Sequence, residues 1–425
     1  MQRNSKSFPI DPKVFIKKCL EWCNSFSHFS YYRPNSYEVL HGPFKHFIGA
    51  DAVKVLTSSV DSFSKLNELV KKEDSWLLGF LSYDLKNETE HLESRHPAFV
   101  EVPHLAFFEP RHLFFFSDNK VTIESPDNPA LIFESIQNRK SIHSSLPEVK
   151  FNANISRDEY LQTMKHIHKH IMEGDIYELN YCIEFTAQKV NISPIEAFLS
   201  LMEISPMPFS VLQKLEMNYL ISASPERFMK KEDQRVISQP MKGTIRRGVN
   251  DIEDHSLKQQ LSADSKERSE NVMIVDLVRN DLSRSAVPGT VSVKELFGIS
   301  TFPKVHQMIS TISAELHPDK TGIEAIANSF PMGSMTGAPK IRAMKLIDAY
   351  ENSSRGWYSG ATGYISPDGN FDFNVVIRSL LYEQAKGLLS YHVGSAITAE
   401  SIPEKEYDEC LLKAQSILEI FTANK

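Results

Sequence analysis

Helical periodicity is clearest in the second half of the chain. Ser156-Arg157-Asp158-Glu159 has the spacing of a capping box, and apolar residues follow it at helical intervals until Gly174. Comparable patterns predict three further helices, which run from Lys266 to Leu282, from Ala338 to Glu351 and from Pro403 to Phe421. We therefore expect four long helices after residue 150.

Apolar and aromatic runs predict strands in both halves of the chain. They are residues 76–83, residues 112–116, Phe373 to Tyr382, and Leu388 to Val393 after a turn at Gly387. Strands and helices occur in blocks, which favours an α+β fold over a doubly wound parallel sheet. A polar stretch at residues 141–148 indicates a linker, so we expect an amino-terminal region, 1–145, and a second region, 150–425.

Composition narrows the class of protein. The chain has 425 residues, of which 41% are hydrophobic and 24% charged, as is ordinary for a globular protein. Its net charge of -7 argues against nucleic acid or an anionic membrane as partner. No apolar run resembles a secretory signal or a membrane span, so we expect a cytoplasmic protein. Cys19 and Cys23 are interpreted as two thiols on one helix face rather than as a zinc site, because no second ligand pair is present.

Two acidic pairs have the i, i+3 spacing that puts both carboxylates on one helix face. They are Glu267 with Glu270, and Glu406 with Glu409, which Lys413 follows one turn later. If the two helices approach each other, these oxygens suit Mg²⁺; otherwise each pair is a solvated helix face. The histidines 166, 168 and 170 alternate with lysines, which favours a solvated face over a metal site.

Glu226 and Lys242 lie on segments that are predicted to be neighbouring strands joined by a hairpin. Lys242 stands between Pro240-Met241 and Gly243-Thr244, without the other charges that are typical of a solvated lysine. Desolvation would lower its pKa and make it a nucleophile. The alternative is an exposed strand lysine.

Three further positions have two interpretations each. The loop Pro331 to Lys340 opens a helix, so it is either a carboxylate-binding helix start or a simple turn. Arg378 lies within an apolar strand and needs either a protein carboxylate or a ligand carboxylate. His306 is either a core histidine or a catalytic one.

Taken together, these segments resemble the chorismate-utilising enzymes. The motifs that carry the resemblance are, in chain order, Ser224-Pro225-Glu226, Pro240 to Arg247, Glu270 to Asp281, Gly333 to Lys340, Tyr358 to Tyr364, Ile377-Arg378 and Pro403 to Glu409. The resemblance covers residues 155–420, and residues 79–84 extend it weakly toward the amino terminus. The resemblance implies a fold of two packed antiparallel β-sheet layers with helices outside and the active site between them.

The same resemblance implies roles for individual residues. Glu270 and Glu409 match magnesium ligands, with Glu267 and Glu406 beside them. Substrate contacts are expected from Tyr358, Arg378, Gly394 and Lys413, and the ring pocket from Thr336 and His306. The expected catalytic residues are Lys242, Glu226 and His306.

Lysine at position 242 resembles the family members that form aminodeoxychorismate, whereas the anthranilate-forming members typically have alanine there. The implied reaction has Lys242 attack C2 of chorismate while Glu226 assists departure of the C4 hydroxyl, after which ammonia enters at C4. No part of the chain resembles a glutaminase, so a glutamine amidotransferase subunit is the expected partner. The alternatives are an anthranilate-forming subunit and a non-catalytic scaffold.

Three positions depart from the family pattern. Glu178 replaces the glutamine usual in the amino-transferring members, and Ala396 replaces a glycine in Gly394-Ser395-Ala396-Ile397. The segment at residues 38–42 only loosely resembles the one that binds tryptophan in related subunits. Feedback inhibition by tryptophan is therefore not expected.

Overall fold

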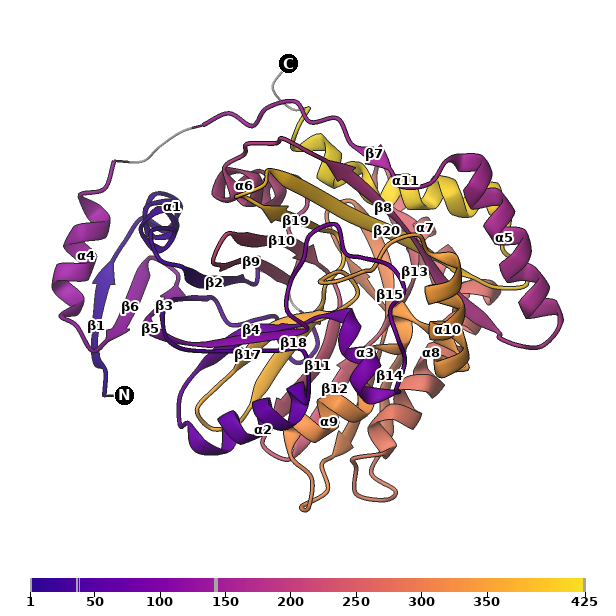
Figure 1. Ribbon diagram of the computed structural model, residues 1–425, viewed down its shortest axis with the longest axis horizontal. Coiled ribbons are helices and arrows are strands. Elements are labelled where there is room, and N and C mark those ends of the chain that lie inside the picture. The colour runs from indigo at the N-terminus through magenta and orange to yellow at the C-terminus, as the bar shows by residue number, and fades with distance from the viewer. Residues whose placement is uncertain (1, 36, 38, 141–143, 423–425) are drawn as a thin grey trace.

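The computed structural model describes residues 2–35, 37, 39–140 and 144–422, and within them all strand pairings are antiparallel. Two layers pack against each other (Figure 1). The first layer consists of β8 (Glu178–Ala187), β20 (Leu388–Ile397), β19 (Ser379–Glu383), β10 (Asn218–Ser224), β9 (Phe209–Leu215) and β2 (His28–Arg33). The second consists of β4 (Leu77–Leu81), β17 (Ala361–Ile365), β18 (Phe371–Val375), β11 (Arg227–Glu232), β12 (Arg235–Gln239) and β15 (Val305–Glu315).

Two long strands join the layers. They are β3 (Phe47–Ser58), which pairs with β2 and β5, and β5 (Leu105–Ser117), which pairs with β3 and β4. A shift in the β3–β5 register between Ala52 and Lys54 accompanies the passage from one layer to the other. Because β2 pairs with β9 and β4 with β17, the first 145 residues complete both layers. The division at 145–150 stays a prediction, and residues 141–143 of the expected linker lie outside the described residues.

Helices cover the outer faces of both layers (Figure 1). On the first layer they are α1 (Pro12–Cys23), α5 (Arg157–Met172), α6 (Pro194–Ile204) and α11 (Pro403–Glu419). On the second they are α2 (Ser62–Lys72), α8 (Ser265–Ser283) and α9 (Gly322–Ser329). Alternation along β8 directs Leu179, Tyr181 and Ile183 into the core between the first layer and its helices. The expected α+β fold of two layers with helices outside is confirmed.

The remaining described elements are shorter or peripheral. They are β1 (Asn4–Pro9), β6 (Lys120–Ser125), β7 (Asn152–Ala153), β13 (Met241–Arg246), β14 (Ser292–Thr301), β16 (Gly337–Ala338), α3 (Lys86–Thr89), α4 (Pro129–Gln137), α7 (Asp251–Ala263), α10 (Lys340–Tyr350), and the 3-10 turns Tyr83–Leu85 and Gly333–Met335. No helix within the described residues is long and apolar enough to cross a membrane. Cys19 and Cys23 are buried free thiols on α1, as the helix-face interpretation requires.

Most of the predicted elements are present, and two needed correction. The capping box of α5 forms, and α8 and α11 have nearly the predicted bounds. The single strand predicted from Phe373 to Tyr382 is in fact β18 and β19, because Arg378 has a left-handed backbone (φ 51°) that interrupts the ladder. The helix predicted from Ala338 begins at Lys340, because Gly337 and Ala338 instead pair with β8.

Gly337 explains that local change. A Cβ built at this position would lie 2.1 Å from the carbonyl oxygen of Glu178, so only glycine allows the loop to approach β8 this closely. Its φ of +147° is also a value that other residues rarely adopt. The loop from Met332 to Pro339 is thereby held against the first residues of β8.

Candidate active site

Lys242 lies in a buried ion pair. It follows the β11–β12 hairpin, which forms as predicted, and its Nζ lies 2.5 Å from Oε1 of Glu178 at the start of β8. The two side chains are 10% and 1% exposed. Burial works to lower the pKa of Lys242, but the carboxylates of Glu178, Glu270 and Glu409 raise it above its usual value. The expectation that desolvation lowers this pKa is therefore wrong for the ligand-free protein, in which Lys242 is an ammonium ion.

Glu226 is a buried carboxyl in the same site. It follows β10, and Oγ of Ser334 donates a 2.7 Å hydrogen bond to its Oε1. Burial raises the pKa of Glu226 to about 7, against the effects of this hydrogen bond and of the charges of Lys242 and Arg378. A substantial fraction of Glu226 is therefore protonated at neutral pH, which suits a proton donor.

The two acidic pairs meet across α8 and α11. Nζ of Lys266 lies 3.8 Å from Oε1 of Glu270 and 3.8 Å from Oε1 of Glu406. Glu267 lies against Gly243, where its Oε2 would be 3.1 Å from an added Cβ. The charge of Glu409 acts on both Glu267 and Lys242. The two helices therefore approach each other, which is the condition under which these carboxylates suit Mg²⁺.

Electrostatics at this acidic cluster favour a cation. Burial raises the pKa of Glu270 to about 7 and also raises that of Glu267, whereas Lys413 lowers the pKa of Glu409. Oε1 of Glu270 is buried and has no hydrogen-bond partner among the described residues. Such an unsatisfied buried carboxylate oxygen is a suitable ligand for Mg²⁺.

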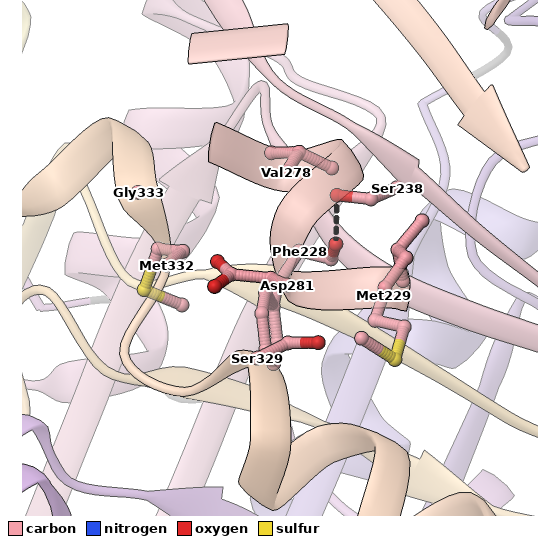
Figure 2. A pocket seen from close by; sticks show the side chains of 9 residues that line it. Phe228, Met229, Ser238, Val278, Asp281, Ser329, Met332 and Gly333 are labelled. Carbon is pink, nitrogen blue, oxygen red and sulfur yellow. Dashed lines mark hydrogen bonds between the residues drawn. The ribbon is translucent and has the colours of Figure 1, made fainter. Parts of the chain in front are cut away.

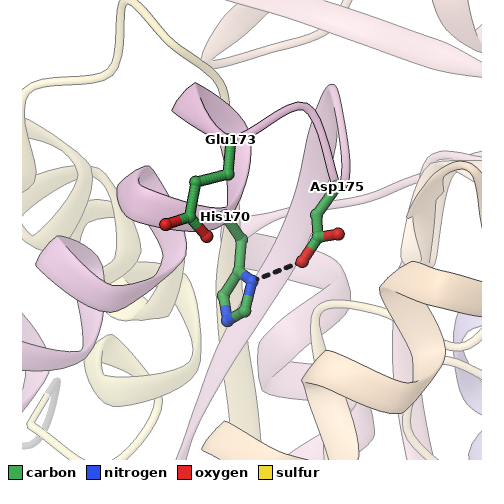
Figure 3. A group of neighbouring side chains, drawn as sticks. All are labelled: His170, Glu173 and Asp175. Atoms are coloured by element: carbon green, nitrogen blue, oxygen red, sulfur yellow. Dashed lines mark hydrogen bonds and ion pairs between the residues drawn. The ribbon is translucent and has the colours of Figure 1, made fainter.

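A group of potential metal ligands lies at the end of α5, away from this cluster. Its ligand atoms lie within 4.8 Å of one another. It consists of His170, Glu173 and Asp175 (Figure 3). Nδ1 of His170 bonds Asp175 at 2.7 Å, and its Nε2 bonds the hydroxyl of Tyr350 at 2.9 Å. Because both ring nitrogens have protein partners, this group is a surface hydrogen-bond network.

Arg378 has no carboxylate partner within the part of the chain that the structure describes. Its nearest hydrogen-bond acceptor is the sulfur of Met207, 4.0 Å from Nη1. Burial lowers the pKa of Arg378 to about 10, although Glu226 opposes this effect. Of the two interpretations left open, a ligand carboxylate fits this guanidinium better than a protein ion pair.

The backbone of Gly394 faces away from β8. It lies opposite Cys182, whose N–H donates to Oε1 of Glu351 at 2.9 Å, so this strand pair is of the non-hydrogen-bonded kind. Both backbone polar groups of Gly394 must then point to the other side, where its carbonyl accepts a 2.9 Å bond from Lys413. The N–H of Gly394 points to the same side, where it can donate to a substrate carboxylate. Lys413 also pairs with Glu409 at 2.8 Å.

Tyr358, Thr336 and His306 are all buried. The ring of Tyr358 stacks on His392 with centroids 4.9 Å apart, and its hydroxyl lies 3.8 Å from Sγ of Cys182. Thr336 donates within its own loop, to the carbonyl of Gly333 at 3.2 Å. Both ring nitrogens of His306 are engaged, one by Asp254 and one by Thr301, each at 3.0 Å. The catalytic role of His306 stays a prediction.

Two residues important to this geometry had no assigned role in the sequence analysis. Ser334 lies within a motif that was recognised, but nothing in its neighbours indicates that its hydroxyl reaches Glu226. Arg355 is 2% exposed and donates to Glu351, to the carbonyl of Met335 and to the carbonyl of Asn180. It ties the loop to β8. No periodicity in the sequence marks it.

A small cavity is lined in part by Met332 and Gly333 of the loop (Figure 2). Its lining includes Phe228, Asp281, Ser329 and Gly333 and none of the candidate site residues. Lys340 neutralises Asp281 through a 3.0 Å ion pair. The cavity therefore belongs to the packing of the loop rather than to the candidate site.

Residues 24–419 match the sequence model of the chorismate binding enzyme family. The chain belongs to this family. Among its relatives, the aminodeoxychorismate synthase component 1 of Klebsiella aerogenes is 35% identical over 345 residues, which are 80% of this chain and 76% of that one. A chloroplastic aminodeoxychorismate synthase of Arabidopsis thaliana is 39% identical over 278 residues, 65% of this chain and 30% of that protein.

Relatives with a second activity in their names also match. The anthranilate synthase component 1 of Thermus thermophilus is 36% identical over 269 residues, which are 63% of this chain and 58% of that one. Among solved structures, anthranilate synthase component I from Streptococcus pneumoniae superposes with a TM-score of 0.78 at 23% identity, covering 90% of this chain and 93% of that chain. That likeness concerns the fold. Overall identity does not separate the two activities.

Proposed function

We propose that the chain is the chorismate-binding subunit of an aminodeoxychorismate synthase and acts in the cytoplasm. The observation that carries the proposal is the position of Lys242, buried between Glu178, Glu226 and the acidic cluster. The amino-terminal region, 1–145, completes the sheet layers, and region 150–425 carries the site residues. The relatives named for this activity support the same conclusion.

In the first half-reaction, the amine of Lys242 bonds to C2 of chorismate and the C4 hydroxyl leaves as water. Two protons leave the Lys242 ammonium. Glu226 gives its own proton to the departing hydroxyl and takes one of these two in its place. The other proton goes to solvent. Arg378 and the N–H of Gly394 are suited to bind substrate carboxylates, and Tyr358 lies beside Cys182, opposite Gly394.

Mg²⁺ is the proposed cofactor. Glu270 and Glu409 would hold it, with Glu267 and Glu406 beside them. The buried Oε1 of Glu270, which has no hydrogen-bond partner among the described residues, fits this role. The ion would supply positive charge that orients a substrate carboxylate and stabilises its charge. Lys413 holds Glu409 next to the backbone of Gly394.

In the second half-reaction, ammonia bonds to C4 and the Lys242 nitrogen leaves C2. We propose a glutamine amidotransferase subunit as the source of ammonia, in keeping with a relative that is named a component 1. The segment at residues 38–42, which only loosely resembles a tryptophan-binding one, has no part in the proposed reaction, and its residue 38 lies outside the described residues.

Product analysis tests the proposal. Purified chain with chorismate, magnesium and an ammonium salt should form a non-aromatic amino product that yields p-aminobenzoate only after a lyase is added. Direct release of fluorescent anthranilate would instead assign anthranilate synthase activity. Absence of chorismate consumption would leave the scaffold interpretation.

A further inference from the structure

Glu178 is a buried carboxylate that uses one of its two oxygens to pair with Lys242. It is 1% exposed, and its Oε1 bonds Nζ of Lys242. Oε2 is buried and has no hydrogen-bond partner within the described part of the chain. Besides Lys242 on β13, the charged groups that act on this pair are Glu270 from α8 and Glu409 from α11. The facing strand β16 contributes the backbone of Gly337 and Ala338.

The proposed reaction removes the partner of Glu178. Once Lys242 is bonded to C2 of the ring, its nitrogen is a neutral secondary amine. Glu178 is then a buried carboxylate without a cation, a state that proteins avoid because the desolvation is no longer compensated. The lysine ammonium in the ligand-free protein shows what chemistry this carboxylate accepts: a primary ammonium group that donates N–H hydrogen bonds.

We infer that Glu178 is the binding site for ammonium, the second substrate, after Lys242 has moved to the ring. This inference rests on the proposed function. Bound ammonium gives one proton to Glu178, and the resulting ammonia forms the bond to C4. As the C2–nitrogen bond breaks, Glu178 returns that proton to the nitrogen of Lys242. Charge and protons balance. The reactants are ammonium and the neutral secondary amine, and the products are the ammonium group on C4 and the neutral amine of Lys242.

Glu178 differs in charge from the residue usual at this position in the family. Glutamine, usual here in the amino-transferring members of the family, is neutral and accepts hydrogen bonds without compensating charge. A carboxylate instead concentrates ammonium, which is the dominant form at neutral pH. This chain should therefore use free ammonium at neutral pH, where the concentration of ammonia is low.

The test compares the parent with Glu178→Gln by measuring the KM for total ammonium at several pH values below the pKa of ammonium. Chorismate and magnesium are saturating. The parent should show a KM that changes little with pH. In the variant the KM should be at least about tenfold higher near neutrality and fall about tenfold per pH unit, because only ammonia is then bound. Glu184→Gln is the matched control, since Glu184 is a second buried glutamate on β8.

The outcomes separate this inference from the proposed function. If the parent forms no aminodeoxychorismate, the proposed function fails. If the parent forms it and Glu178→Gln has the same KM for ammonium at every pH, only the inference fails. If the variant has no turnover, mass spectrometry without ammonium decides: a persisting Lys242 adduct supports the inference, and loss of the adduct in a folded variant overturns it.

Discussion

The hydroxyl of Ser334 donates a 2.7 Å hydrogen bond to Glu226 and so links the loop to the proposed proton donor. This contact stabilises the charged form of Glu226, whose pKa burial nevertheless raises to about 7. Adduct formation on Lys242 should therefore slow as pH rises through about 7, because the protonated form is then lost.

Ser334→Ala tests the role of that bond. Without the donor, the pKa of Glu226 should rise further, so the alkaline limb of the adduct-formation rate moves to higher pH. The rate is measured by rapid quenching across pH without ammonium. Ser283→Ala, on the exposed end of α8, is the control. An unchanged alkaline limb in Ser334→Ala would show that Glu226 is not the group that titrates.

The ionised carboxylate of Glu270 should destabilise the metal-free folded protein, although the proposed magnesium site needs it. Its pKa is raised by burial from the ordinary 4.5 to about 7, so the folded state binds this proton more tightly than the unfolded state. That contribution to stability is present below about pH 4.5 and is lost as pH rises through about 7. At pH above 7 and without metal, Glu270→Gln should therefore stabilise the protein, by up to about 3 kcal/mol.

Thermal unfolding in chelator and steady-state turnover in magnesium measure the two effects of Glu270→Gln. The variant should have a higher Tm in chelator, gain less Tm from magnesium than the parent does, and lose nearly all turnover. Glu404→Gln, an exposed position on α11, should change none of these. Full turnover of Glu270→Gln at limiting magnesium would remove Glu270 from the metal site.

Arg378 should act mainly on binding. Its guanidinium has no carboxylate partner among the described side chains, so a substrate carboxylate would be its first strong one. A charge-assisted hydrogen bond of this kind contributes about 1.5–3 kcal/mol, so Arg378→Met should raise the KM for chorismate by about 10- to 100-fold. Arg235→Met, an exposed strand position, is the control. Equal KM values for both variants and the parent would contradict the assignment.

The source of nitrogen can be tested with the isolated chain. It should turn over chorismate with ammonium salts and not with glutamine, because no segment resembles a glutaminase. Adding a matching glutamine amidotransferase subunit should restore the use of glutamine. Glutamine-dependent turnover by the highly purified chain alone would contradict the proposed partner.

Local sequence patterns were sufficient for most elements of the fold, and they predict that the acidic pairs, Glu226 and Lys242 belong to one site. The spacing of Glu267, Glu270, Glu406 and Glu409 follows from helix geometry, and the hairpin places Glu226 near Lys242. The fold class follows from the blocks of strands and helices together with the family motifs.

Other features depend on contacts between distant segments, which local patterns do not encode. Glu178 and Lys242 are 64 positions apart, so their ion pair could not be read from either segment. That pair reverses the expected direction of the Lys242 pKa shift, because the neighbouring charges outweigh burial. The interruption at Arg378 was hidden because apolar residues continue on both sides of it, before Arg378 and again after Ser379.

The covalent role of Lys242 is the central claim, and mass spectrometry of the peptide that contains it tests this claim most directly. Chorismate and magnesium without ammonium should increase the mass of that peptide by chorismate minus water. Lys242→Ala should lack the adduct and lose most aminodeoxychorismate formation, while Lys304→Ala, an exposed lysine, should retain both. The contradictory result is a Lys242→Ala protein that forms aminodeoxychorismate at the parent rate.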